Sequence, residues 1–317
     1  MTEPVVDARK NHWGVTRELE PRLISHFLAV VDNHTISRAA EVLNLTQPAL
    51  SKSIKQLEDR LGVVLFERWP TGVKMTAYGE VLARRGRLIQ REISHAVTEL
   101  HSMKGGATGV IRIGAGLVWV QNYLPPVIAD FLKARPGMEV ELRTGVIDTL
   151  VPRLVSGDLD IICTTLDFPD SSDIVKEPLV DVVHGIFARE GHPLLGAEDI
   201  APEDLAEWGW ITMKNDYVGH NRLGSFYAAN GLEPPRVRME LAADIAILSM
   251  IAQSDHLCSL PIAFETMAAR HGVMQVGLFD SKLWSSTAGI AYRRTDYPAP
   301  AVNTLLTMIR ESFATNE

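Results

Sequence analysis

The sequence predicts an α/β protein in which a small helical domain with a two-stranded wing precedes a long helix and a larger, two-lobed α/β domain. Three observations support this prediction. Two helical segments with a tight turn between them fall within residues 35–61, an apolar repeat of helical spacing follows residue 76, and strand-like and helical runs alternate after residue 106. The predicted boundaries are a flexible extension at 1–20, the small domain at 21–78, the long helix at 79–106 and the larger domain at 107–317.

The first two helices of the small domain are short and apolar on one side. The upstream helix takes its apolar side from Leu23, Phe27, Val30 and Val31. The second helix is expected to be capped by Ser37, whose hydroxyl can accept a hydrogen bond from a free amide of the first turn. Its small apolar face consists of Ala39, Ala40, Val42 and Leu43. Asn44-Leu45 then breaks the helical repeat.

The third helix is amphipathic. Thr46 is expected to cap it, and Pro48 is tolerated in its first turn because no hydrogen-bond donor is needed there. One side carries the apolar stripe Leu50, Ile54, Leu57 and Leu61, and the other carries Gln47, Ser51, Lys52 and Lys55. These donors and cations suit phosphates and base edges in a DNA major groove. The alternative is an ordinary helix pair whose outer face is only solvated.

A wing is predicted directly after the third helix. Residues 63–76, VVLFERWPTGVKMT, resemble two short strands that turn at Pro70-Thr71-Gly72. Arg68 and Lys74 flank this turn, so either cation could reach a neighbouring phosphate.

The run SRAAEVLNLTQPALSKSIKQLEDRLGVVLFER, with residues 72–80 after it, resembles the winged helix-turn-helix of the LysR-type transcriptional regulators. The resemblance implies that the helix starting at Gln47 is the recognition helix, with Gln47, Ser51 and Lys52 nearest the bases. Many relatives have a basic residue where this chain has Thr71. The predicted DNA-binding residues are Ser37, Arg38, Thr46, Gln47, Pro48, Ser51, Lys52, Lys55, Arg68 and Lys74.

A long helix is expected from Thr76, as its cap, to the Gly105-Gly106 pair. Its apolar residues recur at steps of three and four: Val81, Leu82, Leu88, Ile89, Ile93, Ala96, Val97, Leu100 and Met103. Such a stripe needs a partner, either the body of the same chain or a second copy. The resemblance implies dimerisation through this helix, and therefore a homodimer or homotetramer. Two of its DNA-binding domains could then bind the two halves of a pseudo-palindromic site.

Composition and charge fit a soluble protein with one acidic and one mildly basic part. The 317 residues are 46% hydrophobic and 22% charged, and no apolar run is long enough for a membrane span or a secretory signal. We therefore expect a cytoplasmic protein that does not enter a membrane. Residues 1–103 hold 14 Lys+Arg and 12 Asp+Glu, whereas residues 104–317 hold 17 and 27. The net charge of −8 therefore comes from the C-terminal part and leaves nucleic-acid binding by the N-terminal part possible.

The larger domain is predicted to consist of two lobes. Strand-like runs at 110–116, 138–145 and 159–165, with helices at 121–134 and 148–156, predict a parallel sheet with covering helices. A second group has strands at 174–179, 184–190, 209–213 and 236–241, helices at 219–230 and 244–253, and a returning strand at 256–261. The strand at 287–294 and the helix at 301–313 should pack back on the first group. Lobe I is thus expected at about 107–166 and 268–317, and lobe II at about 167–267.

The resemblance to LysR-type regulators extends more loosely over this half and implies a periplasmic-binding-protein-like effector domain with a cleft between its lobes. Ligands of such sheets settle at the carboxyl ends of the strands. The predicted lining is Leu117, Val118, Trp119, Thr144, Gly145, Thr164, Thr165, Thr212, Met213 and Arg222. Trp119 could stack on a ring or belong to the core, and Arg222 could bind an acidic effector or be a solvated surface residue. The expected effector is an organic acid or an aromatic or sugar-derived compound.

Catalytic and metal-binding patterns are absent from the sequence. The ten histidines lack metal-ligand spacing, and no nucleophile elbow, phosphate loop or dinucleotide fingerprint occurs. Cys163 and Cys258 could form a redox sensor, although thiols in apolar strands are usually buried and inert. We therefore expect a regulator that is not an enzyme, has no cofactor, and binds promoter DNA, a small effector and RNA polymerase. The alternatives are a small-molecule-binding or enzymatic protein, or a nucleoid protein without sequence preference.

Overall fold

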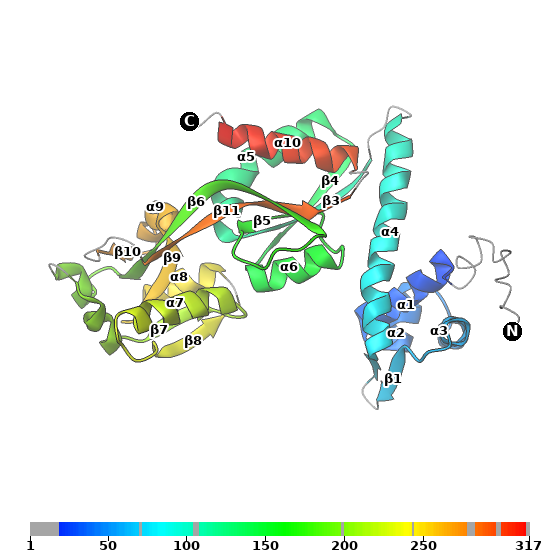
Figure 1. Cartoon of the computed structure of the whole chain (residues 1–317), viewed down its shortest axis with the longest axis horizontal. Helices are drawn as coiled ribbons and strands as arrows, with labels where there is room; N and C mark the ends of the chain where they lie inside the picture. The colour runs from blue at the N-terminus through cyan, green and yellow to red at the C-terminus, as the bar shows by residue number, and fades with distance from the viewer. Residues whose placement is uncertain are drawn as a thin grey trace, which may run out of the picture. The chain divides into compact units, whose positions relative to one another are not determined.

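The computed structural model describes residues 19–69, 72–103, 108–197, 200–242, 244–277, 283–295 and 299–314 (Figure 1). The chain divides into two compact units, residues 1–98 and 99–317. The residues predicted as an N-terminal extension lie outside the described part up to residue 18. None of the helices in the described segments is long and apolar enough to cross a membrane.

Three helices form the core of the first unit: α1 (Pro21–Asn33), α2 (Ile36–Val42) and α3 (Gln47–Leu61). Thr46 caps α3 as predicted, because its hydroxyl accepts from the Ala49 amide at 3.4 Å. The predicted cap of α2 is wrong by two residues. Thr35 has the extended backbone of an N-cap and accepts from the Arg38 amide at 3.2 Å, whereas Ser37 lies inside the first turn.

The core of this unit lies between the apolar sides of these helices. Phe27, Leu50 and Leu57 are fully buried in it, as the predicted stripes require. Val42 departs from the prediction, since 61% of it is exposed. The buried side of α2 consists of Ala39 and Ala40, with Ile36 and Leu43 packed partly against the same core, and Val42 lies on the solvent side.

Two strands, β1 (Phe66–Trp69) and β2 (Gly72–Met75), pair antiparallel and form the predicted wing. The Glu58 carboxylate of α3 accepts hydrogen bonds from the amides of Leu65 and Phe66, at 2.7 and 3.3 Å, and so fixes where β1 begins. On the other strand, Gly72 has a φ of +141°, and a Cβ there would lie 2.5 Å from the His34 carbonyl oxygen. This glycine lets the wing pack against the end of α1. The predicted turn residues Pro70 and Thr71 lie outside the described residues.

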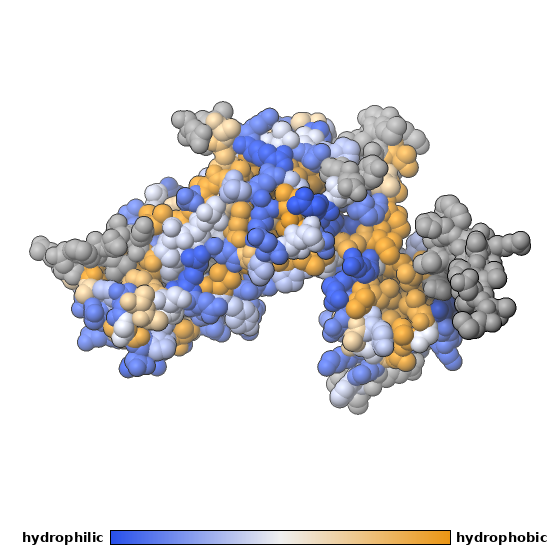
Figure 2. Space-filling view, in the orientation of Figure 1, coloured by the Kyte–Doolittle hydropathy of each residue, from blue (hydrophilic) through white to orange (hydrophobic). Residues whose placement is uncertain are grey.

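Helix α4 (Ala77–Met103) is capped by Thr76, whose hydroxyl accepts from the Gly79 amide at 3.1 Å. Its first half packs on α1, where Arg87 pairs with Asp32 at 2.7 Å. Its second half keeps an apolar stripe exposed: Ile93, Val97 and Leu100 are 44, 47 and 59% accessible. Figure 2 shows apolar residues gathered along this helix. The predicted Gly105-Gly106 end lies outside the described residues.

The second unit is organised around one mixed seven-stranded sheet, with strand order β10-β6-β11-β5-β3-β4 and β9 paired to β6. Its strands are β3 (Gly109–Ala115), β4 (Met138–Thr144), β5 (Ile161–Thr165), β6 (Ile174–Arg189), β9 (Cys258–Pro261), β10 (Val273–Val276) and β11 (Trp284–Arg293). The pairs β3–β4 and β3–β5 are parallel, as predicted for lobe I. β11 pairs antiparallel with both β5 and β6.

The long strands β6 and β11 extend through both lobes of this unit (Figure 1). The two strands predicted at 174–179 and 184–190 are therefore one continuous strand, because residues 180–183 between them pair with β11 and do not form a turn. The ladder shifts register between Ala288 and Gly289. A Cβ at Gly289 would lie 1.9 Å from the Glu177 carbonyl oxygen, so the strands can approach this closely only with glycine there.

Helices cover this sheet and surround a smaller one, in which β7 (Trp210–Met213) and β8 (Val237–Leu241) are parallel. The helices are α5 (Leu124–Ala134), α6 (Ile147–Val155), α7 (Tyr217–Ala229), α8 (Asp244–Ile251), α9 (Glu265–Ala269) and α10 (Pro300–Ala314). Helix α10 packs with α5 in one apolar core, which bears out the predicted return of the C-terminal helix to lobe I. Neither β10 nor α9 was predicted from the sequence, because they are only four and five residues long.

Candidate functional site

The exposed face of α3 carries the side chains predicted to contact DNA bases. Gln47 and Lys52 are exposed, Ser51 is half-buried, and the Gln47 amide nitrogen lies 3.4 Å from the Ser51 hydroxyl, which it donates to. Lys55 is exposed one turn further along. Among the described residues, neither Lys52 nor Lys55 forms an ion pair. The face therefore presents positive charge that no described residue neutralises.

The remaining predicted DNA-binding residues surround this face. Ser37 and Arg38 are exposed in the first turn of α2, Pro48 is exposed in the first turn of α3, and Lys74 is exposed on β2. Thr46 also caps α3, which occupies its hydroxyl as an acceptor. Arg68 lies in β1, opposite Val73, but its side chain and the whole of Thr71 fall outside the described part. Contact of these residues with DNA stays a prediction.

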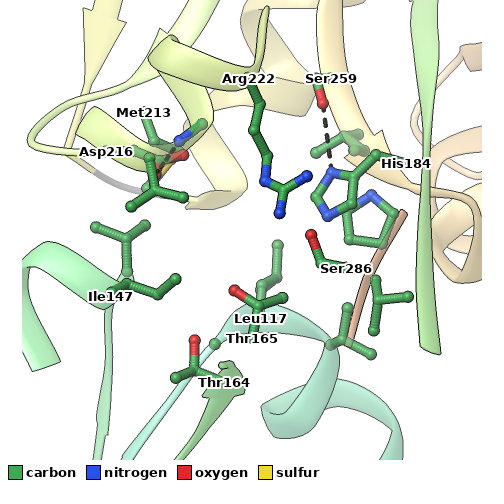
Figure 3. Close-up of a pocket in the computed structure, with 18 of the residues that line it drawn as sticks. Leu117, Ile147, Thr164, Thr165, His184, Met213, Asp216, Arg222, Ser259 and Ser286 are labelled. Atoms are coloured by element: carbon green, nitrogen blue, oxygen red, sulfur yellow. Dashed lines mark hydrogen bonds between the residues drawn. The ribbon is translucent and has the colours of Figure 1, made fainter. Parts of the chain in front are cut away.

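A cavity of about 190 Å³ lies in the second unit (Figure 3). It opens at the carboxyl ends of β3, β4, β5 and β7, where ligands of α/β sheets bind. Of the predicted lining residues, Thr144 is absent from the cavity wall and is exposed at the end of β4. The others line the cavity as predicted: Leu117, Val118, Trp119, Gly145, Thr164, Thr165, Thr212, Met213 and Arg222. Their role in binding stays a prediction.

Trp119 belongs mainly to the core. Only 2% of it is accessible, and its ring packs on Tyr123 and Phe313 with centroids 5.4 Å away in both cases. The aromatic packing fixes the short π-helical turn Trp119–Tyr123 that follows the cavity loop. Trp119 was expected either to stack on a ligand ring or to belong to the core. The structure supports the core role for its ring.

Arg222 projects from α7 into the cavity beside His184 (Figure 3). Its Nη2 atom lies 2.8 Å from Oδ2 of Asp167, and its Nη1 atom donates to the Ser285 carbonyl at 3.3 Å. The side chains of Arg222 and Asp167 are only 31 and 28% accessible. Asp167 was not predicted from the sequence, although it lies only two residues after Thr165, the last residue of β5.

His184 is a second polar group of the cavity that the sequence did not reveal. It stacks on Trp284 with ring centroids 5.0 Å apart, and its Nδ1 atom lies 3.4 Å from the Ser259 hydroxyl. Burial, together with the nearby Arg222 charge, lowers the pKa of His184 to about 4. The ring is therefore neutral at physiological pH. These residues come from β6, β9 and β11, and no local sequence motif connects them.

Two polar residues at the start of α7, the N-cap Asp216 and His220, line the cavity. Asp216 caps the helix by accepting from the Gly219 amide at 2.9 Å, and burial raises the pKa of its carboxyl. The His220 Nδ1 donates to the Asp216 carbonyl, while its Nε2 lies 2.9 Å from the Thr212 hydroxyl and 3.4 Å from Glu240. The predicted Thr212 hydroxyl is thus already engaged within the lobe.

Neither cysteine has the surroundings of a redox sensor. Cys163 and Cys258 are free, buried thiols, and burial raises the pKa of each well above its usual range. In the described segments, no three acidic, histidine or cysteine side chains are placed to hold a metal ion.

A helix-turn-helix with an exposed basic face and a two-lobed domain with an internal cavity together define a ligand-responsive DNA-binding protein. The family "LysR substrate binding domain" matches residues 104–314, and "Bacterial regulatory helix-turn-helix protein, lysR family" matches residues 21–80. The chain belongs to the LysR family of transcriptional regulators.

Known relatives agree with this assignment. The chain is 27% identical to the HTH-type transcriptional regulator GbpR of Azospirillum brasilense, over 96% of this chain and 90% of that protein. It is 26% identical to the HTH-type transcriptional regulator PcaQ of Agrobacterium fabrum, over 94 and 96%. Full-length CbnR complexed with its target DNA has the same fold, with a TM-score of 0.64 and 18% identity over 93% of this chain and 100% of that one. The prediction of a transcriptional regulator that is not an enzyme is confirmed.

Proposed function

We propose that this regulator binds double-stranded promoter DNA through α3 and that a small molecule in the cavity of the second unit controls the binding. The observation that carries the DNA-binding part is the two-sided character of α3. Its apolar side is buried in the core through Leu50, Ile54 and Leu57, while Gln47 and Lys52 on its other side are exposed. A helix held this way can enter a major groove without unfolding its domain.

The active form is proposed to be a homodimer or homotetramer. The stripe Ile93, Val97 and Leu100 on α4 is apolar and exposed, and its spacing of four and three places it on one helix face. A second copy of α4 would cover it and bring two α3 helices to a pseudo-palindromic site. Acting on promoter DNA also requires access to RNA polymerase, so we infer that the protein works in the cytoplasm.

Ligand control is proposed to act on the contact between α6 and α7, which flank the cavity. The Asp148 carboxylate of α6 accepts from the Val218 amide of α7 at 3.2 Å. Val218 also packs against the apolar cluster of α6, which includes Ile147 and Leu150. A ligand changes DNA binding only if it binds one arrangement of the lobes more tightly than another. A ligand in this cavity contacts both lobes, so its affinity depends on how the lobes are arranged.

The DNA-binding proposal is tested with a duplex selected in vitro by the full-length protein and with a scrambled duplex of the same composition. We expect fluorescence anisotropy to show at least about a thousandfold preference for the selected duplex, and affinities that fall steeply with salt for both. A steep salt dependence with equal affinity for the two duplexes would support a nucleoid protein instead.

A further inference from the structure

The geometry of the cavity points to an uncharged aromatic alcohol or phenol, and not to a carboxylate, as the class of ligand that it accepts. This inference rests on the proposed function, since it concerns the same cavity. The deciding feature is that the protein itself already neutralises the cavity's arginine. Three observations support this assignment: the Arg222 ion pair, the other charges around the cavity, and the chemistry of its walls.

The ion pair with Asp167 neutralises the positive charge of Arg222, so Arg222 has no free charge to attract a ligand anion. Its guanidinium contacts Asp167 at 2.8 Å and the Ser285 carbonyl at 3.3 Å. Both charged side chains are more than two-thirds removed from solvent. A ligand carboxylate that took Arg222 would leave Asp167 as an uncompensated charge that is more than two-thirds removed from solvent, which is unfavourable.

Carboxylates outnumber the fixed positive charges around the cavity. Arg222 is the one arginine or lysine among the described residues that line it, whereas Asp167 and Asp216 both line it. Asp148 lies close enough to contribute to the raised pKa of Asp216, and Glu240 lies 3.4 Å from the His220 Nε2. His184 is neutral and adds no positive charge. The carboxylates around the cavity therefore repel an anion.

The walls suit a ring that carries a hydroxyl group. Trp284, Leu117, Ile147 and Met213 supply apolar surface, and Figure 3 shows the Thr164 and Ser286 hydroxyls among them. A volume of about 190 Å³ is similar to the roughly 150 Å³ that holds a benzene ring in an engineered protein cavity. A neutral hydroxyl can both donate and accept, which matches hydroxyl and imidazole partners.

The test compares benzyl alcohol with benzoate, which have the same ring and differ in charge. Each is titrated at up to about 10 mM, because molecules of this size bind weakly. Thermal unfolding and calorimetry on the full-length protein report binding. We expect benzyl alcohol to raise the melting temperature and to bind at least tenfold more tightly than benzoate. Equal or tighter binding of benzoate, or no binding of benzyl alcohol, would overturn the inference.

The variant Asp167→Asn removes the neutralising charge and keeps the size of the side chain. We expect its affinity for benzoate to rise by about tenfold, because Arg222 then faces the ligand with a free charge. Asp130→Asn is the matched control, since it breaks the exposed Asp130–Lys133 pair at 3.1 Å outside the cavity. Benzoate binding that stays unchanged in Asp167→Asn contradicts the inference. If that variant does not fold, the wild-type comparison decides alone.

Failure of this inference is distinguishable from failure of the proposed function. Preference for the selected duplex is measured without any ligand, so it can hold while benzoate proves the better ligand. In that case the cavity is a site for anions and the DNA-binding assignment is unaffected.

Discussion

The exposed face of α3 and the internal cavity use positive charge in opposite ways. Lys52 and Lys55 are exposed, and the described residues provide no carboxylate partner for them. Arg222 is two-thirds buried and paired with Asp167. DNA binding gains affinity from free cations that displace counterions from phosphates. In a cavity for a small neutral ligand, a charge that already has a counter-ion in the wall does not require one from the ligand.

The two sites also differ in how the chain assembles them. The residues of α3 and its N-cap that are predicted to contact DNA lie within one stretch of ten residues, 46–55, and one helix positions them. The cavity draws residues from position 116 to position 288 and depends on the packing of two lobes. Substitutions in the core beneath α3 should therefore affect the DNA-binding face alone. Changes of pH and of the contacts between the lobes should affect the cavity.

The largest effect is expected from Leu57→Ala, since Leu57 is fully buried beneath α3. The lost contacts and the cavity left behind should lower the free energy of unfolding of the first unit by about 2–5 kcal/mol. Chemical denaturation followed by circular dichroism measures this. Val42→Ala in the same unit is the control and should cost less than about 0.5 kcal/mol, because Val42 is 61% exposed. Similar losses of unfolding free energy in the two variants would mean that Leu57 does not belong to the core of the first unit.

Acidification should weaken the second unit through His184. Its pKa in the folded state is about 4, below the 6.5 of a free histidine, so the unfolded chain takes up the proton first. Stability is therefore complete above pH 6.5 and falls as the pH drops from about 6.5 towards 4, with a loss of about 2 kcal/mol at pH 5. Denaturation at pH 7.5 and pH 5 measures the loss, which His184→Gln should reduce.

The exposed His271 supplies the control for this experiment. His271→Gln should leave the difference between pH 7.5 and pH 5 as it is in the wild type. If His184→Gln also leaves it unchanged, the buried ring is not the source of the acid sensitivity.

Gln47→Ala and Lys55→Ala should separate reading of bases from binding of phosphates. Losing the Gln47 contact with a base should reduce the preference for the selected duplex by about 1–3 kcal/mol. Losing Lys55 should weaken both duplexes alike and reduce the slope of log affinity against log salt by about 1. Anisotropy titrations over a salt series measure both effects. Equal losses on both duplexes for the two variants would remove the base-reading role of Gln47.

The smallest effect is expected from Asp148→Asn, which weakens one hydrogen bond between α6 and α7. Replacing the carboxylate with a neutral amide should cost about 0.5–1.5 kcal/mol and raise hydrogen exchange at the Val218 amide by roughly threefold to tenfold. Asp173→Asn, which removes an exposed loop carboxylate bonded to Ser172, should leave that amide unchanged. Unchanged exchange in Asp148→Asn would mean that the contact does not hold the lobes.

Local patterns in the sequence were sufficient to predict the first unit. The spacing of Leu50, Ile54 and Leu57 fixed the buried side of α3, and Thr46 fixed its start. The cap of α2 was misplaced because Thr35 and Ser37 offer the same hydroxyl chemistry two residues apart. Only the extended backbone at Thr35 distinguishes the two residues, and residue type alone does not determine backbone angles.

The cavity was predictable where strand ends bring residues together and not elsewhere. Thr164 and Gly145 follow parallel strands, so their place could be inferred. Thr144 was misplaced by one residue, since neighbouring strand residues face opposite sides. His184 and Asp167 could not be found, because their partners Ser259 and Arg222 lie 75 and 55 positions away along the chain.

The most direct test of the DNA-binding role of α3 is lysine modification of the full-length protein, read by mass spectrometry, with and without the selected duplex. We expect Lys52 and Lys55 to lose reactivity when the duplex is bound, while Lys133 on the exposed surface of α5 in the second unit keeps it. Full reactivity of Lys52 and Lys55 in the bound state, with protection at other lysines, would contradict the assignment of α3 as the helix that enters the DNA.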